Sequence, residues 1–265
     1  MTEATVLDIS GLTVDLPTAD GETRVLHGVD LALHPGRIHG LAGESGSGKT
    51  MTGLAVLGLL PRGARASGRI LLDDADLLTL PPRRLTALRG SSVSMVFQDP
   101  ATSLHPMLSI GHQLTDHLRH HRGLDRKQAR ERAAELLAEV RIPDPRQALR
   151  RYPHQFSGGM RQRIAIAIAL VCEPRVLIAD EPTTALDVTV QAGVLRLLRR
   201  LCDERGLAVL LVTHDLGVMS AIADEVSVMR RGLVVENGPR GQVFTEPRHE
   251  YTRVLLDALP ERNTR

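Results

Sequence analysis

Several residue types are scarce in this chain of 265 residues, and the scarcity excludes whole classes of protein. There is no tryptophan, and the only two cysteines, Cys172 and Cys202, both fall in apolar helical patterns. So few cysteines favour a reduced, cytosolic compartment. The longest apolar run, 164–172, is about half the roughly 18 residues that a membrane helix needs. The first ten residues include an acid and no long apolar stretch, so no secretory signal is expected. We therefore expect a soluble, intracellular protein.

Lysine is nearly absent, although lysine and arginine together number 33. Lys49 and Lys127 are the only lysines, a bias that we attribute to genome composition. A position that still carries lysine is therefore of interest. The formal net charge of +2 is no signature of a nucleic-acid partner, and none is expected. Apolar residues at 42% and charged residues at 24% exclude a disordered or fibrous chain.

Residues 43–50 match the pattern G-x-x-x-x-G-K-[ST] of a phosphate-binding loop, the Walker A motif. A short strand is predicted before it at 37–42, and a buried helix after it at 50–60. Glycines let the backbone approach phosphate oxygens, and a helix N-terminus adds its positive end. Lys49 is expected to reach the β- and γ-phosphates, and the Thr50 hydroxyl to bind Mg²⁺. The predicted nucleotide-binding residues are Gly43, Glu44, Ser45, Gly46, Ser47, Gly48, Lys49 and Thr50.

A second apolar run, residues 176–179, ends in the acids Asp180 and Glu181. It predicts a buried parallel strand, and ligands bind at the carboxyl ends of such strands in open α/β sheets. Asp180 would hold the Mg²⁺ shell, and Glu181 would act as general base toward the attacking water. Taken alone, the run also fits a strand that ends in a solvated acidic turn. The phosphate loop favours the catalytic interpretation.

The spacing of apolar residues divides the chain into three kinds of segment. Residues 1–36 and 65–75 alternate apolar and polar positions and predict antiparallel strands. Residues from about 100 to 155 are rich in Arg, Ala and Leu and predict a separate helical block. Strands and helices then alternate, at 175–180, 188–204, 208–212, 216–222 and 225–230. The alternation indicates a parallel sheet covered by helices, so the expected fold class is α/β.

Six motifs in a fixed order make the chain resemble the ATP-binding-cassette (ABC) ATPases over nearly its full length. They are GESGSGKT at 43–50, VFQDP at 96–100, FSGGMRQR at 156–163, VLIADEP at 176–182, TALD at 184–187 and VTHD at 212–215. The segments FQDPATSLHP, PTTALDVTVQ and HEYTR at 249–253 are typical of the peptide/nickel importer branch. The resemblance implies a P-loop (RecA-like) core with an antiparallel β subdomain and an inserted helical subdomain. Residues 1–265 would form a single nucleotide-binding domain, with its helical part at about 100–155.

The resemblance also assigns roles to residues outside the phosphate loop. They are Gln98, Ser157, Gly158, Gly159, Asp187 and His214. In this family, two ATPase domains hold two ATP molecules between them, and the Ser-Gly-Gly run contacts the γ-phosphate held by the other subunit. Gln98 would contact Mg²⁺ and the attacking water, His214 would contact the γ-phosphate, and Asp187 would link the two sites. Taken alone, Gln98 also fits a strand-end amide bonded to backbone, and a structural role would be favoured for His214.

These features imply a cytoplasmic, ATP-hydrolysing subunit of a bacterial ABC importer, which uses MgATP to take up peptides or a metal chelate such as nickel. It would dock on two integral-membrane permease subunits at the cytoplasmic face of the inner membrane. Segment 97–110, with Leu104 and Met107, is expected to meet the permease. A second ABC ATPase, forming a heterodimer, and an extracytoplasmic solute-binding protein are also implied. The alternative is a non-transport ABC ATPase, such as a carbon–phosphorus lyase accessory subunit.

Two further features point to sites only weakly. His117, His120 and His121 have a helical spacing that could seat a metal, but no nearby cysteine or acid pair completes the set. A solvated helix face is the favoured interpretation. Arginines from Arg119 to Arg151 outnumber the nearby acids and could meet nucleic acid or anionic lipid. A solvated face beside a membrane partner is favoured there.

The absence of an aromatic residue before the phosphate loop predicts weak selection of the nucleotide base. The family usually stacks adenine on an aromatic side chain before the phosphate loop. Here no Phe, Tyr or Trp precedes Phe97, and Leu16 falls near the expected place. Stacking on a base is worth about 1–3 kcal/mol in nucleic-acid complexes, so without it ATP and GTP should bind with similar affinity. Titration of both nucleotides tests this, and a preference for ATP of about tenfold or more would contradict it.

Overall fold

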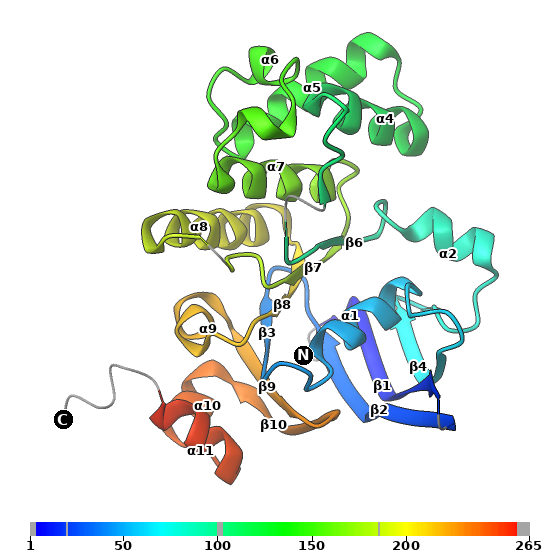
Figure 1. The fold of residues 1–265 in the computed structure, drawn as a ribbon, viewed down its shortest axis with the longest axis vertical. Helices are drawn as coiled ribbons and strands as arrows, with labels where there is room; N and C mark the ends of the chain where they lie inside the picture. The colour runs from blue at the N-terminus through cyan, green and yellow to red at the C-terminus, as the bar shows by residue number, and fades with distance from the viewer. Residues whose placement is uncertain (1–3, 20, 100–102, 185, 259–265) are drawn as a thin grey trace.

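The computed structural model describes residues 4–19, 21–99, 103–184 and 186–258, whose strands form two sheets (Figure 1). One sheet has four strands and the other has six. Residues 100–102 of the FQDPATSLHP segment and Ala185 of the TALD motif lie outside the described residues. Within the described ranges, every helix is too short or too polar to cross a bilayer.

The four-stranded sheet is antiparallel and confirms the strands predicted from alternation in 1–36 and 65–75. Its order is β2-β1-β4-β5, with β1 at Leu7–Thr18, β2 at Gly21–Leu33, β4 at Arg65–Leu72 and β5 at Ala75–Asp76. Leu7 and Ile9 of β1 are buried, and the register shifts between Ile9 and Leu12, where Gly11 has a φ of 58°. The shift returns Leu12 to the buried face, because side chains alternate sides along a strand.

The six-stranded sheet has the order β10-β9-β3-β8-β7-β6. Its strands are β3 (Ile38–Ala42), β6 (Val93–Val96), β7 (Val176–Asp180), β8 (Ala208–Val212), β9 (Glu225–Arg230) and β10 (Leu233–Pro239). Neighbours from β6 to β9 pair in parallel, and β10 adds an antiparallel edge. β3, β6, β7 and β8 are buried along their whole length, as expected for strands with both faces covered. Their carboxyl ends lie at one edge of the sheet.

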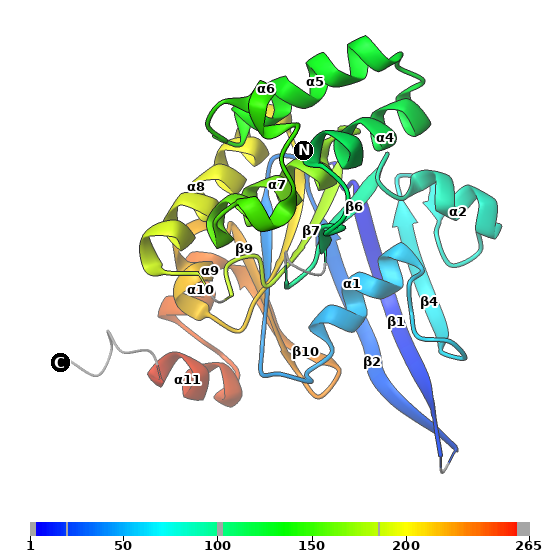
Figure 2. The ribbon, with the colours of Figure 1, turned by 45° about the horizontal axis from the view of Figure 1, so that its top comes forward.

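Helices cover both faces of the six-stranded sheet (Figure 2). Helix α1 (Lys49–Leu57) lies between this sheet and the antiparallel one, and its buried side chains share a core with both. Helices α7 (Gly158–Leu170) and α8 (Val188–Arg205) pack on the opposite face. Three shorter helices pack around β9 and β10, namely α9 (Leu216–Ile222), α10 (Arg240–Thr245) and α11 (Glu250–Asp257). Helix α2 (Pro82–Leu88) follows β5.

An inserted helical layer lies between β6 and α7 in the sequence and above the sheet in Figure 1. It contains α4 (Ile110–Arg122), α5 (Arg126–Glu139), α6 (Pro145–Ala148) and a short 3₁₀ helix at Pro153–Gln155. Ser109 caps α4, and Asp125 with Gln128 forms a capping box on α5, which fixes where each helix starts. The predicted fold class is confirmed, namely an α/β P-loop core with an antiparallel β subdomain and an inserted helical subdomain.

The turn before α4 differs from the expectation that both Leu104 and Met107 face a permease. Leu104 is 1% exposed and belongs to the core of the helical layer, whereas Met107 is 76% exposed. The Gln113 side chain accepts from the N–H of His105 and donates to its carbonyl, which holds the turn in place. Met107 is therefore open to solvent, whereas Leu104 is almost wholly covered by its neighbours.

Replacing Leu104 should destabilise the fold, while replacing Met107 should not. We expect Leu104→Ala to lower the free energy of unfolding by about 2–5 kcal/mol, because it leaves a cavity in a packed core. Met107→Ala is the matched control and should change it by less than about 0.5 kcal/mol. Urea unfolding of both variants measures the difference. Equal stability of the two variants would contradict the placement of Leu104.

Candidate functional site

The phosphate loop, residues 43–48, connects β3 to α1 through backbone conformations that glycine adopts most readily. Gly43, Gly46 and Gly48 have φ values of 147°, 78° and 108°. A Cβ at Gly43 would lie 2.2 Å from the backbone oxygen of Met229 in β9, and one at Gly48 would lie 2.6 Å from Leu26 in β2. The glycines therefore let the loop pack directly on both strands at the start of α1.

Lys49 opens α1, and its ammonium group lies inside the phosphate loop. Its Nζ donates to the backbone oxygens of Gly43 and Glu44, each at 2.8 Å, and the residue is 6% exposed. Burial lowers the pKa of Lys49, while the carboxylates of Glu181, Asp180 and Glu44 act to raise it. Phosphate oxygens would compensate this buried charge better than neutral carbonyls do, because hydrogen bonds between charged groups are stronger. The loop is thus suited to an anion.

Thr50 and Asp180 bring a hydroxyl and a carboxylate together between α1 and the end of β7. The Thr50 Oγ1 donates to the Asp180 Oδ1 at 3.2 Å. Asp180 is 4% exposed, and burial raises the pKa of its carboxyl against the opposing effect of the Thr50 hydrogen bond. Such oxygens, together with phosphates, are the ligands that Mg²⁺ takes in nucleotide sites. Among the residues that the structure describes, those of α4 with its histidines included, no group of three or more His, Cys, Asp or Glu could hold a metal.

Glu181 directly follows β7, and three side chains lie within hydrogen-bond distance of its carboxylate. Its Oε1 lies 2.7 Å from the Nδ1 of His214, and its Oε2 accepts from Thr184 at 2.7 Å and from Gln98 at 3.1 Å. Burial acts to raise the pKa of Glu181, but the hydrogen bonds from His214 and Thr184 outweigh it and hold the pKa below its usual range. The residue also has a φ of 46°, a strained conformation that occurs preferentially at functional sites. The carboxylate is therefore ionised near neutral pH and held in one position, as a general base requires.

Glu181, Gln98 and His214 line a cavity of about 390 Å³ at the carboxyl edge of the six-stranded sheet. Its lining residues are Gly43, Glu44, Ser45, Gln98, Glu181, His214, Leu216 and Leu255. The fold thus brings the start of the phosphate loop together with Gln98, Glu181 and His214, from four separate parts of the sequence. A positioned carboxylate and hydrogen-bonding side chains around one cavity, next to the loop that holds the Lys49 ammonium, are suited to transfer of a phosphoryl group to water.

The remaining predicted residues form a second group, which comprises Ser157, Gly158, Gly159 and Asp187. Ser157 caps α7 by accepting from the N–H of Met160, and Asp187 caps α8 by accepting from the N–H of Val190. A Cβ at Gly159 would lie 2.3 Å from the Val190 side chain, so glycine allows the starts of α7 and α8 to pack closely. None of the four lines the cavity around Glu181. The chain therefore presents two separate groups of predicted nucleotide contacts.

Three residues to which the sequence assigned no role also belong to the site. Thr184 donates to the Glu181 carboxylate, Leu255 lines the cavity, and the hydroxyl of Tyr251 accepts from the N–H of Glu44 at 3.2 Å. Thr184 and Tyr251 lie inside two of the family motifs, TALD and HEYTR. The motifs give no sign of the contacts themselves, since Tyr251 and Glu44 are 207 positions apart.

Comparison with known proteins relates the chain to ATP-binding subunits of transporters. A family model described as ABC transporter matches residues 26–184. A putative peptide import ATP-binding protein of Brucella abortus is 49% identical over 259 residues, covering 97% of this chain and 78% of the relative. The dipeptide transport ATP-binding protein of Bacillus subtilis is 46% identical, covering 96% and 77%. The oligopeptide transport ATP-binding protein of Salmonella typhimurium is 44% identical, covering 96% and 76%.

Solved structures give the same relationship at lower identity. An ATP-binding cassette bound to ADP and Pi, in a dimeric post-hydrolysis state, superposes with a TM-score of 0.77 at 28% identity, covering 88% of this chain and 98% of the other. A Clostridium perfringens protein that is part of an ABC transporter complex superposes with a TM-score of 0.78 at 29% identity, covering 98% and 97%.

Thr184→Val should move the acid limb of the rate–pH profile of ATP hydrolysis to higher pH. The Thr184 hydroxyl stabilises the ionised form of Glu181, so its loss should raise the pKa of that carboxyl; with Glu181 as the general base, activity should then begin to fall at a higher pH. We also expect kcat to fall by about tenfold at neutral pH, because the carboxylate loses a hydrogen bond that positions it.

Thr79→Val is the matched control, because the Thr79 hydroxyl is exposed and donates to the backbone oxygen of Asp76, away from Glu181. Rate measurements across the pH range on both variants decide the question. An acid limb that stays in place in Thr184→Val would show that Thr184 does not set the ionisation of Glu181.

Proposed function

This chain belongs to the ABC transporter family, and we propose that it is the ATP-hydrolysing subunit of a bacterial ABC importer that takes up peptides. Its relatives from Brucella abortus, Bacillus subtilis and Salmonella typhimurium are named for peptide, dipeptide and oligopeptide transport. None of these three names mentions nickel or a non-transport enzyme complex, which favours peptides over nickel and an importer over an accessory subunit of a lyase.

The observation that carries the proposal is the Glu181 carboxylate, held by His214, Thr184 and Gln98 beside the buried cation of Lys49. In ATP hydrolysis, Glu181 would accept a proton from the attacking water as it approaches the γ-phosphate. His214 and Gln98 would orient the carboxylate and the phosphate. Catalysis of phosphoryl transfer depends mainly on positioning and charge stabilisation, which this arrangement supplies.

The phosphate loop and the end of β7 support MgATP as the bound ligand. Lys49 would exchange its two carbonyl partners for β- and γ-phosphate oxygens, and the loop N–H groups would hold the remaining phosphate charge. Thr50, Asp180 and Gln98 would hold Mg²⁺, directly or through its waters. When bound, the ion would draw negative charge from the phosphates and so favour attack by water.

The separation of the two groups of predicted contacts supports a composite site built from two ATPase subunits. Ser157, Gly158 and Gly159 lie at the start of α7, outside the cavity that contains Glu181. They would contact the γ-phosphate bound in the phosphate loop of a second ABC ATPase, with Asp187 linking the two sites. We propose that this second ATPase is a different chain, so that the pair is a heterodimer.

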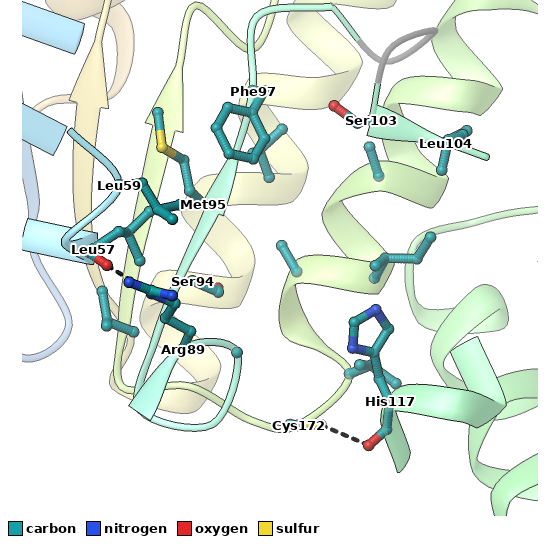
Figure 3. Close-up of a pocket in the computed structure, with 17 residues that line it drawn as sticks. Leu57, Leu59, Arg89, Ser94, Met95, Phe97, Ser103, Leu104, His117 and Cys172 are labelled. Atoms are coloured by element: carbon teal, nitrogen blue, oxygen red, sulfur yellow. Dashed lines mark hydrogen bonds between the residues drawn. The ribbon is translucent and has the colours of Figure 1, made fainter. Parts of the chain in front are cut away.

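A second cavity, of about 460 Å³, supports the docking of a permease (Figure 3). Leu57, Leu59 and Met95 line one side, and Leu104 and His117 line the other. Arg89 lies on the same side, below Leu57 in the view, and donates to the carbonyl of Leu57 at the end of α1. The hollow is mainly apolar, and Leu59 and Phe97 at its rim are both about two-fifths exposed. An exposed apolar hollow of this kind is suited to an apolar segment of a partner.

The complete assembly would contain two permeases, the two ATPases and an extracytoplasmic solute-binding protein. This subunit would be peripheral, at the cytoplasmic face of the inner membrane. We also propose that residues 1–265 act as one nucleotide-binding domain, with the helical part at about 100–155 next to the permease. The apolar cavity lies between that helical part and the sheet, where a partner would contact both.

Affinity purification of tagged Glu181→Gln protein from detergent-solubilised host membranes, in MgATP, tests the assembly. Removing the general base should prevent hydrolysis and keep the ATP-bound dimer closed, so the sample should contain two permeases and a second ATPase. Recovery of soluble enzymes alone would contradict the importer and favour the non-transport alternative.

Docking at segment 97–110 is tested by adding Met107→Asp to the same protein. A charge on this exposed side chain should greatly reduce recovery of the permeases while the second ATPase is still recovered. Leu233→Asp, at another exposed apolar residue on β10, is the matched control and should leave permease recovery unchanged. Permease recovery that is unaffected by Met107→Asp would move the docking site elsewhere.

A further inference from the structure

Helix α11 forms one wall of the nucleotide cavity, although it lies far in the sequence from the phosphate loop and from Glu181. Its residue Leu255 lines the cavity together with the start of the phosphate loop, Glu181 and His214. Its residue Tyr251 is 5% exposed and packs in the core formed with α9, α10 and β9. A buried tyrosine usually directs its hydroxyl to a hydrogen-bond partner, and here that partner is the phosphate loop.

The Tyr251 hydroxyl accepts a hydrogen bond from the backbone N–H of Glu44, the second residue of the loop, at 3.2 Å. The carbonyl of the same residue accepts from Lys49 at 2.8 Å and from the N–H of Ser47 at 3.2 Å. Glu44 is therefore held on both sides of its Cα. If Lys49 turns toward a phosphate, it releases this carbonyl, whereas the bond to Tyr251 does not depend on Lys49. Tyr251 can thus hold the loop in place while Lys49 changes partners.

The ring of Tyr251 is itself fixed in place. The guanidinium of Arg230, at the end of β9, lies 4.8 Å from the ring centroid, within the range of a cation–π contact. Burial raises the pKa of the Tyr251 hydroxyl, so the hydroxyl stays neutral across the physiological range. Its oxygen is therefore available as an acceptor for the Glu44 N–H.

The start of α11 is anchored separately, through Glu236 of β10. The carboxylate of Glu236 accepts from the backbone N–H groups of Arg248 and His249, at 2.7 and 3.0 Å. The His249 side chain then accepts from the N–H of Tyr251 at 3.1 Å and caps the helix. These bonds fix α11 to the sheet without involving the phosphate loop, so the helix provides a rigid support from which Tyr251 reaches Glu44.

We propose that Tyr251 is a positioning residue of the nucleotide site, which holds the phosphate loop in its binding conformation through the N–H of Glu44. The inference rests on the proposed function, since it takes MgATP as the ligand of the loop. Without the hydroxyl, the loop would become ordered only when nucleotide binds, and the cost of that ordering would appear as weaker binding. The effect should therefore fall mainly on nucleotide affinity rather than on the chemical step.

The test replaces each of the two tyrosines of the chain by phenylalanine. Tyr251→Phe keeps the buried ring beside Arg230 and removes only the hydroxyl, while Tyr152→Phe makes the same change at a half-exposed residue before α7. We expect Tyr251→Phe to weaken MgADP binding and raise the KM for ATP by about three- to tenfold, the range set by one neutral hydrogen bond, with kcat within about twofold. Tyr152→Phe should match the wild type in MgADP affinity, in the KM for ATP and in kcat.

Thermal unfolding and ¹⁹F NMR separate positioning from a merely structural role. The midpoint of unfolding of Tyr251→Phe should stay near that of Tyr152→Phe. The NMR experiment uses full-length protein labelled with 3-fluorotyrosine, in which the Tyr251 resonance is the one that disappears in Tyr251→Phe. Addition of MgADP should shift the Tyr251 resonance and leave the Tyr152 resonance unchanged.

The possible failures can be distinguished. Wild-type affinity in Tyr251→Phe, or a Tyr251 resonance that ignores MgADP, would overturn the positioning role and leave the proposed function standing. Weaker binding that accompanies a lowered unfolding midpoint would show a structural role and also overturn the inference. Wild-type protein that binds no MgADP and hydrolyses no ATP would overturn the proposed function and this inference with it.

Discussion

The burial of one ammonium group, that of Lys49, is the constraint on which the rest of the site depends. A buried cation needs close compensation, and here two loop carbonyls and the nearby carboxylates supply it. The loop can fold around the ammonium because Gly43 has no side chain to meet the backbone of Met229. The N–H of Gly232 also donates to the carbonyl of Ser47 at 2.8 Å. The β9–β10 hairpin and the phosphate loop therefore hold each other in place.

Much of the fold and of the site could be predicted because their signals are local. An apolar run that ends in Asp180 and Glu181 predicts a buried strand with two acids at its carboxyl end, and β7 is that strand. The phosphate loop is a local pattern as well, since its glycines are required by backbone conformations within a few residues. Parallel pairing then places the ends of β3, β7 and β8 side by side, so residues predicted separately meet at one edge.

The rest could not be predicted, because it depends on how distant segments pack. Leu104 lies in a segment that the sequence predicts to be on the surface. Packing of the inserted helices buries its side chain and leaves that of Met107 exposed. Tyr251 reaches the phosphate loop only because β10 and α11 return the chain to β9. No hydrophobic periodicity in the sequence predicts such a contact. Thr184 and Glu181 are only three positions apart in the sequence. Their hydrogen bond nevertheless depends on the strained backbone turn at Glu181, and no sequence pattern predicts that turn.

The junction after β6 relates the two cavities of the molecule. Phe97 lines the apolar cavity proposed for the permease, and the next residue, Gln98, lines the nucleotide cavity and donates to Glu181. The two cavities therefore share a boundary at a single peptide link. A partner that displaced Phe97 would act one residue away from the side chain that donates to Glu181, and a nucleotide that displaced Gln98 would act one residue away from the wall of the apolar cavity. Any coupling of the two ligands through this segment would be reciprocal, because each ligand would change the affinity for the other by the same factor.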